Sequence, residues 1–281
     1  MSLAGSIVFS TVDIAGVDNA TTLTVQRGAS ISTDGLGMKT GKGKTAGREA
    51  VSIEGHRLFL IPNLKDYVRL PEAVLETYAG ELQQNHPNVK SGGGSGAGHG
   101  GEGADGCGPW GGSGGLAFGS LGLPFDLGSG GAAGSIPLQG GRGGGRVRVR
   151  WPGLLRIDGR VSANGQNGTC SYRLAKNVTM KEYSGGGGAG GSVQIIANQI
   201  RGRGLLEATG GHSPKKCNLW DLFSGGGGGG GGRLAVLAFR NDAAFKVLMQ
   251  GGESGGEHCM AAGAGTFFRG LLTDPFDRYD R

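Results

Sequence analysis

The stretch that decides the fold is Gly140–Gly165, GGRGGGRVRVRWPGLLRIDGRVSANG. It reads as a glycine block, a strand of alternating apolar and basic residues, a Trp-Pro-Gly turn, and a second alternating strand closed by Asn-Gly. Successive side chains of a strand point to opposite faces, so Val147 and Val149 share one face and the intervening arginines share the other. The stretch therefore predicts a buried apolar face and an outward basic face.

The pattern of this stretch returns along the chain. The first strand recurs at Val193–Ala197 and at Leu234–Ala238, and the second at Leu206–Gly210, at Val247–Gly251 and, upstream, at Ile31–Gly35. The glycine blocks are Gly143–Gly145, Gly185–Gly191 and Gly225–Gly232. A unit of two or three short strands cannot bury its apolar face alone, so successive units are expected to stack.

Stacked units predict an all-β fold, a parallel β-helix or β-solenoid with long glycine-rich excursions and one short helix. Its core would be a thin layer of Val, Ile, Leu and Ala, with glycine where backbones approach closely. Two alternatives stay open. An antiparallel β-sandwich is disfavoured by the lack of two-residue hairpin turns. Polyglycine II packing could hold locally, in residues 91–145 or 225–232.

The chain divides into five regions, which we expect to form one continuous domain. Residues 1–62 hold N-terminal strands, and residues 63–90 hold a helical insert that contains the amphipathic segment Pro71–Gln84. Residues 91–145 are a glycine-rich irregular excursion, residues 146–270 are the repetitive β coils, and residues 271–281 are a polar tail.

Composition limits the class of protein. Glycine fills 64 of 281 positions but proline only 9, which excludes collagen. The net charge of +6 favours polyanionic partners, although it could equally serve solubility. No window approaches the roughly 18 apolar residues of a transmembrane helix. The first residues lack the basic start of a signal peptide, so an extracellular chain would need a targeting signal that these residues do not supply.

The succession of segments resembles a known kind of protein. The segments, in order, are ISTDGLG, GAGHGGEGADG, GGLAFGS, LPFDLGSGG, GGRGGGRVRV, LLRIDGRVSANGQNG, GGGGAGGSVQI, IRGRGLLEATGG, GGGGGGGGRLAV and GAGTFF. They are similar to the glycine-rich β-helix-like regions of large, mostly uncharacterised eukaryotic secreted or cell-surface proteins. The segment Pro71–Gln84 and the basic insert Lys39–Arg48 depart from that pattern. The resemblance implies a structural role outside the cell or on its surface, and supplies no catalytic residues.

The basic face is the candidate binding site. Its residues are Arg146, Arg148, Arg150, Arg156, Arg201 and Arg203. We expect Arg201 and Arg203 in the second strand of the coil that follows Arg146–Arg160. A basic stripe across stacked coils could bind the carboxylates or sulfates of an acidic polysaccharide. The alternative is that outward charges only keep the β surface soluble. Other surface proteins are further candidate partners, whereas nucleic acid is disfavoured because aromatic residues are not interleaved with the arginines.

Cysteines and sequons bear on location. Cys170 and Cys217 follow equivalent second strands and could pair, which would leave Cys107 and Cys259 to each other; free thiols are the alternative in a reducing compartment. Three N-x-[ST] sequons, at Asn19, Asn167 and Asn177, are candidates for N-glycosylation on an extracellular protein.

Catalytic and metal motifs are weak. Gly41–Thr45 lacks the spacing of a phosphate loop, and the GxSxG match at Gly111–Gly115 has no strand-to-helix elbow around it. His99, Glu102 and Asp105 could gather around a metal, but their glycine-rich setting favours a solvated loop. We therefore predict a non-enzymatic chain without cofactor or metal. The alternative is a polysaccharide-active enzyme on a parallel β-helix that uses acids such as Asp158, Glu207 or Asp242.

Overall fold

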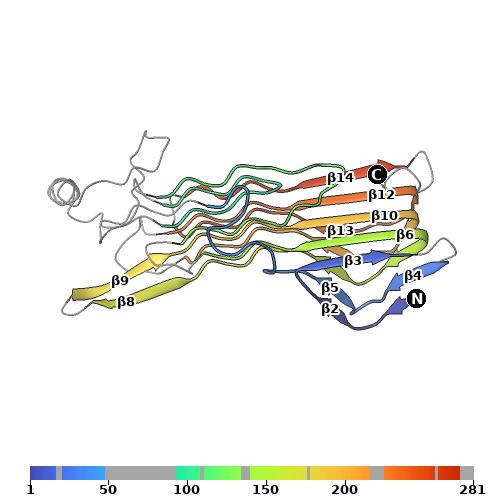
Figure 1. The fold of residues 1–281 in the computed structure, drawn as a ribbon, viewed down its shortest axis with the longest axis horizontal. Coiled ribbons are helices and arrows are strands. Elements are labelled where there is room, and N and C mark those ends of the chain that lie inside the picture. The colour runs from blue at the N-terminus through green and yellow to red at the C-terminus, as the bar shows by residue number, and fades with distance from the viewer. Residues whose placement is uncertain are drawn as a thin grey trace.

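The computed structural model describes residues 1–16, 21–47, 93–107, 111–133, 140–175, 178–215, 225–256 and 259–272. These residues form an elongated molecule with β-sheets at one end, a bundle of extended glycine-rich segments in the middle, and a β-hairpin at the far end (Figure 1). The predicted helix at Pro71–Gln84 lies outside the described residues. Within the described ranges, no helix has the length and hydropathy needed to cross a membrane.

Two parallel sheets contain the repeated strands. The larger sheet runs in the order β1 (Ser2–Leu3), β4 (Thr22–Val25), β6 (Arg146–Ile157), β10 (Ser192–Arg201), β12 (Arg233–Asn241) and β14 (Thr266–Leu271), and β3 (Thr11–Ala15) also pairs with β6. The smaller sheet runs β13 (Lys246–Leu248), β11 (Leu205–Glu207), β7 (Arg160–Ser162), β5 (Ser30–Ser32) and β2 (Ser6–Val8). Only the hairpin β8 (Cys170–Ala175) and β9 (Val178–Ser184) is antiparallel among the described pairs. The prediction of an all-β chain with parallel sheets is thus confirmed for these residues.

The repeat register agrees with the sequence pattern. Val147 pairs with Val193, and Val193 pairs with Leu234, so the equivalent strands lie side by side. In the smaller sheet, β5, β7, β11 and β13 align in the same way. The chain passes from the larger sheet to the smaller sheet and back, once per unit (Figure 1).

The predicted Trp-Pro-Gly turn is wrong. Strand β6 continues through Pro152 and Gly153 to Ile157, and the register with β10 shifts at this point, which is a β-bulge. The Asn198 side chain of β10 donates a hydrogen bond to the Pro152 carbonyl there. A bulge tolerates proline because the inserted residue leaves the ladder of hydrogen bonds. The chain turns later, at Asp158 and Gly159.

The core lies between the two sheets. Inward side chains of the larger sheet meet inward side chains of the smaller sheet, and nearly all are removed from solvent. They include Val147, Val149, Leu155 and Ile157 of β6, Val193, Ile195 and Ile200 of β10, Leu234 and Val236 of β12, and Ile31, Val161 and Leu206 of the smaller sheet. This is the thin Val, Ile, Leu and Ala layer that the alternation predicts.

Beyond the sheets, the glycine segments form a bundle in which every segment bonds to several others. The backbone N–H groups of residues 186–191 donate in turn to Ala132, Gly227, Gln166, Ser129, Gly230 and Ala163. These acceptors belong to three neighbouring segments, and the same segment accepts again at every third residue. The carbonyls of residues 186–189 accept from three further segments, at Gly141, Ala97 and Gly211. Six neighbours and a period of three residues are what an extended polyproline II-type helix allows, since it has no internal hydrogen bonds.

Glycine is required in this bundle by space. A Cβ on Gly187 would lie 1.9 Å from the carbonyl oxygen of Gly211, and one on Gly188 would lie 2.1 Å from that of Arg142. These neighbours are backbone atoms, which cannot rotate away. The region predicted as an irregular excursion, residues 91–145, supplies some of these packed segments, such as residues 93–98, 128–133 and 140–145.

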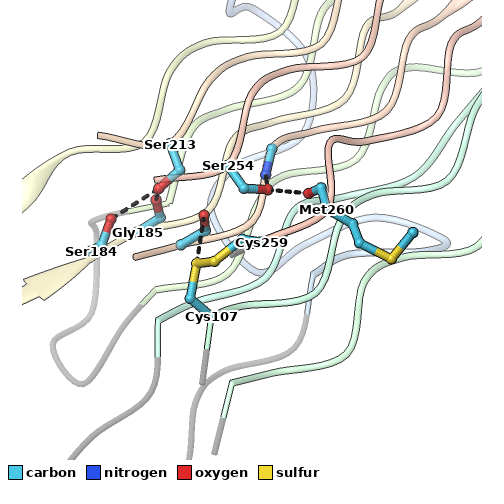
Figure 2. The surroundings of a disulfide bond; sticks show 9 residues. Cys107, Ser184, Gly185, Ser213, Ser254, Cys259 and Met260 are labelled. Carbon is cyan, nitrogen blue, oxygen red and sulfur yellow. Dashed lines mark hydrogen bonds between the residues drawn. A yellow bond between two sulfur atoms is a disulfide. The ribbon is translucent and has the colours of Figure 1, made fainter. Parts of the chain in front are cut away.

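A disulfide ties the bundle together (Figure 2). Cys107 and Cys259 are bonded, with their Cα atoms 5.5 Å apart. Nearby, the hydroxyls of Ser184 and Ser213 lie 2.9 Å apart, and the Ser213 hydroxyl also donates to the Gly185 carbonyl. Cys170 is also disulfide-bonded, whereas Cys217 lies outside the described residues.

Replacing a glycine at the centre of the bundle should destabilise the protein strongly. We expect Gly188→Ala to lower the free energy of unfolding by about 3 kcal/mol or more, because overpacking against backbone forces segments apart. The control is Gly5→Ala, since a Cβ on Gly5 would have no atom within 4 Å. Chemical denaturation would measure the free energy of unfolding of both variants. Equal stability of the two would contradict the close packing of neighbouring segments around Gly188.

Loss of the disulfide should also destabilise the fold. The bond joins residues 152 positions apart, so its removal frees a long loop in the unfolded chain. We expect Cys107→Ser combined with Cys259→Ser to lower the free energy of unfolding by about 2–5 kcal/mol in thermal or denaturant melts. Met260→Ala is the neighbouring control, because that side chain is 84% exposed. An unchanged melt for the double variant would show that the bond does not constrain the bundle.

Candidate anion-binding face

The outward side of the larger sheet carries most of the predicted arginines. Val147, Val149 and Ile200 point into the core, so the residues next to them along each strand point outward. Arg240 lies on the same outward side because it pairs with Gln199, the residue before Ile200. The face so formed, called the arginine face below, consists of Arg146, Arg148, Arg150 and Arg156 of β6, Arg201 of β10 and Arg240 of β12.

Arg203 does not belong to the arginine face. It follows β10 in the turn, where its backbone N–H donates to Asp158. Arg201 ends β10 and pairs with Arg156, so it lies in a first strand and not in the second strand where the sequence analysis placed it. Arg240 joins the arginine face although alternation from Leu234 and Ala238 would turn it inward, because the alternation shifts between Ala197 and Ile200 and the paired positions of β12 follow.

Carboxylates lie among the exposed arginines. Asp242 accepts from Arg240 at 2.9 Å and lies 3.6 Å from Arg201, while Asp158 accepts from Arg156 at 2.5 Å. The pKa of the Asp242 carboxyl is lowered, most strongly by the hydrogen bond from the Gln199 amide and less strongly by the charge of Arg240. Arg156, Arg201 and Arg240 remain 58%, 49% and 68% exposed. Exposed ion pairs are weak, so these guanidinium groups can exchange their carboxylates for another anion.

The opposite end of the arginine face, next to the glycine bundle, is covered by a segment called the strap, residues 116–127. The Phe125 ring lies 3.7 Å from the Arg146 guanidinium, and the Phe125 carbonyl accepts from Arg146. Burial lowers the pKa of the Arg146 guanidinium. Arg148, 24% exposed, lies 3.9 Å from Asp13. The accessible part of the arginine face is therefore its turn end, at Arg156, Arg201 and Arg240.

The strap also fixes other side chains beneath it. Arg233 donates to the Phe118 carbonyl at 2.6 Å and is only 7% exposed, and Ser192 donates to the Asp126 carbonyl at 2.6 Å. Lys44 forms an ion pair with Asp126 at 2.7 Å. Arg233 therefore stabilises the strap and does not offer its charge to a ligand.

The prediction of a solvated loop at His99, Glu102 and Asp105 is wrong for His99, which is buried. Glu102 and Asp105 are exposed, as predicted, and the Asp105 carboxylate accepts a hydrogen bond from the Gly114 backbone N–H. Across the described part of the chain, no group of three or more His, Cys, Asp or Glu side chains is arranged to hold a metal ion.

His99 instead completes the hydrogen bonds of the glycine bundle. Ala97 donates its N–H to the Gly187 carbonyl. With a period of three residues, the next donor along that segment is expected to reach the Gly190 carbonyl. The chain reverses at Gly101, and the His99 Nδ1 lies 2.7 Å from the Gly190 carbonyl in its place. Burial lowers the pKa of His99 to about 4, so the ring is neutral and Nδ1 carries the donated proton.

The acids of the enzyme alternative are held by other side chains. Glu207 accepts from Arg160, which also contacts Asp34, while Asp158 and Asp242 bind arginines. In the Gly41–Thr45 segment, Lys44 contacts Asp126 of the strap, and the Thr45 hydroxyl donates to the Gly98 carbonyl of the bundle. Asn167 is exposed and its Oδ1 accepts from His212, while Asn19 and Asn177 lie outside the described residues.

Comparison with protein-family models, with curated proteins and with solved structures finds no match for this chain.

Acid should weaken the fold through His99. The folded pKa of about 4 lies below the ordinary value of 6.5, so protonation favours the unfolded chain, and stability falls as the pH drops from 6.5 towards 4. The loss should reach about 2 kcal/mol by pH 5. Denaturant melts at pH 7.5 and pH 5 would measure it. Arg233 and Asp126 act on the same ring in opposite directions, Arg233 lowering and Asp126 raising its pKa.

His99→Gln keeps an N–H donor without a titrating ring and should remove this part of the pH dependence. His212→Gln is the control, because His212 is exposed. The same pH dependence in His99→Gln as in the wild type would show that His99 is not the group responsible.

Proposed function

We propose that this chain is a non-enzymatic structural or adhesive module of a surface or extracellular protein. It is built as a parallel β-solenoid and binds acidic polysaccharide through the arginine face. The solenoid is supported by strands of successive units that pair in register in both sheets, with a shared core between them. The glycine segments extend each unit beyond its strands, which gives a long, narrow shape (Figure 1).

A location outside the cytosol is supported by the disulfides. Cys107 and Cys259 are bonded, and Cys170 is bonded as well. Such bonds persist in oxidising environments and are rare in the cytosol. Backbone hydrogen bonds throughout the bundle also suit a rigid spacer or platform, because they leave the glycine segments few alternative arrangements.

The observation that carries the binding proposal is the convergence of six arginines from three neighbouring strands on one face. Strand separation of about 4.8 Å places them in closely spaced rows. The acidic side chains among them are Asp13 and Asp242, with Asp158 at the turn, so the positive charge is in excess. Guanidinium groups bind carboxylates and sulfates with paired, charge-assisted hydrogen bonds.

Binding to heparin, a sulfated polysaccharide, tests this proposal. The variant Arg156→Ser/Arg201→Ser/Arg240→Ser should bind about tenfold more weakly or worse, because it loses three exposed contacts of roughly 0.5 kcal/mol each. The wild-type affinity should fall as salt is added. Isothermal titration or surface plasmon resonance would measure both effects.

The matched control removes the same charge elsewhere. Lys39, Lys42 and Lys246 are exposed and lie off the arginine face, so Lys39→Ser/Lys42→Ser/Lys246→Ser should keep near-wild-type affinity. An equal loss in both triple variants would reduce the interaction to net charge alone. No heparin binding by the wild type would remove the proposal.

A further inference from the structure

Strand β14 closes the larger sheet with an exposed edge. Among the described residues it pairs only with β12. Phe267 and Leu271 continue the inward rows of Leu234 and Ala238, yet they are 40% and 74% exposed, whereas Leu234 and Ala238 are fully buried. The outermost strand of the larger sheet, among the residues that the structure describes, therefore presents core-type side chains to solvent.

One inward row changes character at this edge. The row runs Ile14, Val149, Ile195, Val236 and then Arg269. The four apolar members belong to or pack against the core, whereas Arg269 is exposed and donates from Nη2 to the Asn241 carbonyl at 3.1 Å. A guanidinium thus occupies the position where the next unit of the stack would place its apolar contact.

The other end of the stack is also apolar. Val8 ends β2 and is 57% exposed, Phe9 follows it and is 66% exposed, and Ile14 of β3 is half-buried. All strands of the larger sheet run in the same direction. The β3 edge of a second copy could therefore lie parallel to β14 and continue the inward rows in register.

We propose that the β14 edge matches the N-terminal edge of a second copy, and that Arg269 prevents the two edges from pairing in the wild type. Pairing would bury the Arg269 guanidinium between Val236 and Ile14 of the second copy without a carboxylate partner, and burying such a charge is strongly unfavourable. An inward-pointing charge on an edge strand is a known protection against edge-to-edge pairing. Because the contact is head-to-tail, it would propagate to longer assemblies once the charge is removed. This proposal does not depend on polysaccharide binding.

Analytical ultracentrifugation of the whole chain tests the proposal. Arg269→Val should raise the sedimentation coefficient as protein concentration increases, while the wild type stays at a constant value. Arg203→Val is the matched control, since it removes an exposed arginine outside the arginine face and should behave as the wild type. A concentration-independent Arg269→Val, or association of Arg203→Val to the same extent, would overturn the role of Arg269.

A second substitution tests which edge is the partner. Adding Ile14→Arg to Arg269→Val should restore the constant sedimentation coefficient, because the arginine at position 14 of the second copy would bring a charge back into the same inward row. Thermal unfolding of each variant verifies its fold, and Phe9→Arg replaces Ile14→Arg if the latter lowers the midpoint. Association that survives the second substitution would overturn head-to-tail pairing.

Discussion

Backbone-to-backbone hydrogen bonding between glycine segments is the constraint on which the remaining structure depends. The N–H groups of residues 186–191 reach carbonyls of three segments in a fixed rotation, and a Cβ on the glycines of this run would clash with neighbouring backbone. This packing aligns the segments lengthwise, so the strands that continue from them enter the larger sheet at matching positions. The register of Val147, Val193 and Leu234 follows from both the bundle and the apolar core. The two halves of the molecule thus support each other.

The outward position of the arginines in the arginine face depends on that register. A one-residue slip would turn every arginine inward and every valine outward, so the buried rows and the basic face are two results of one alignment. The strap then divides the face in chemical terms. Near the bundle, Arg146 stacks on Phe125 and loses solvent, whereas near the turns Arg156, Arg201 and Arg240 keep theirs. A surface that is uniform in sequence therefore differs in accessibility along its length.

Strand alternation in the sequence was enough to predict the stacked strands, the inward rows and the outward position of Arg146, Arg148 and Arg150. It did not predict the continuation of β6 through Pro152 and Gly153, because a local turn signal competed with pairing to strands far along the chain. The glycine segments gave no alternation at all, and their partners, such as Ala132 for Gly186, are distant in sequence. The carboxylates that meet the arginines also come from other strands, so composition alone could not place them.

The bond between Cys107 and Cys259 has a mechanical consequence. It encloses the strands from β6 to β13 within a covalent loop, since all of them lie between the two cysteines in sequence. Pulling on the chain outside this loop would first load the hydrogen bonds that join β6 to β3 and β4, and those that join β12 to β14. Once those bonds break, the residues outside the loop can extend, whereas the enclosed residues cannot add to the length of the chain while the disulfide is intact. Reduction would convert the enclosed residues into releasable length.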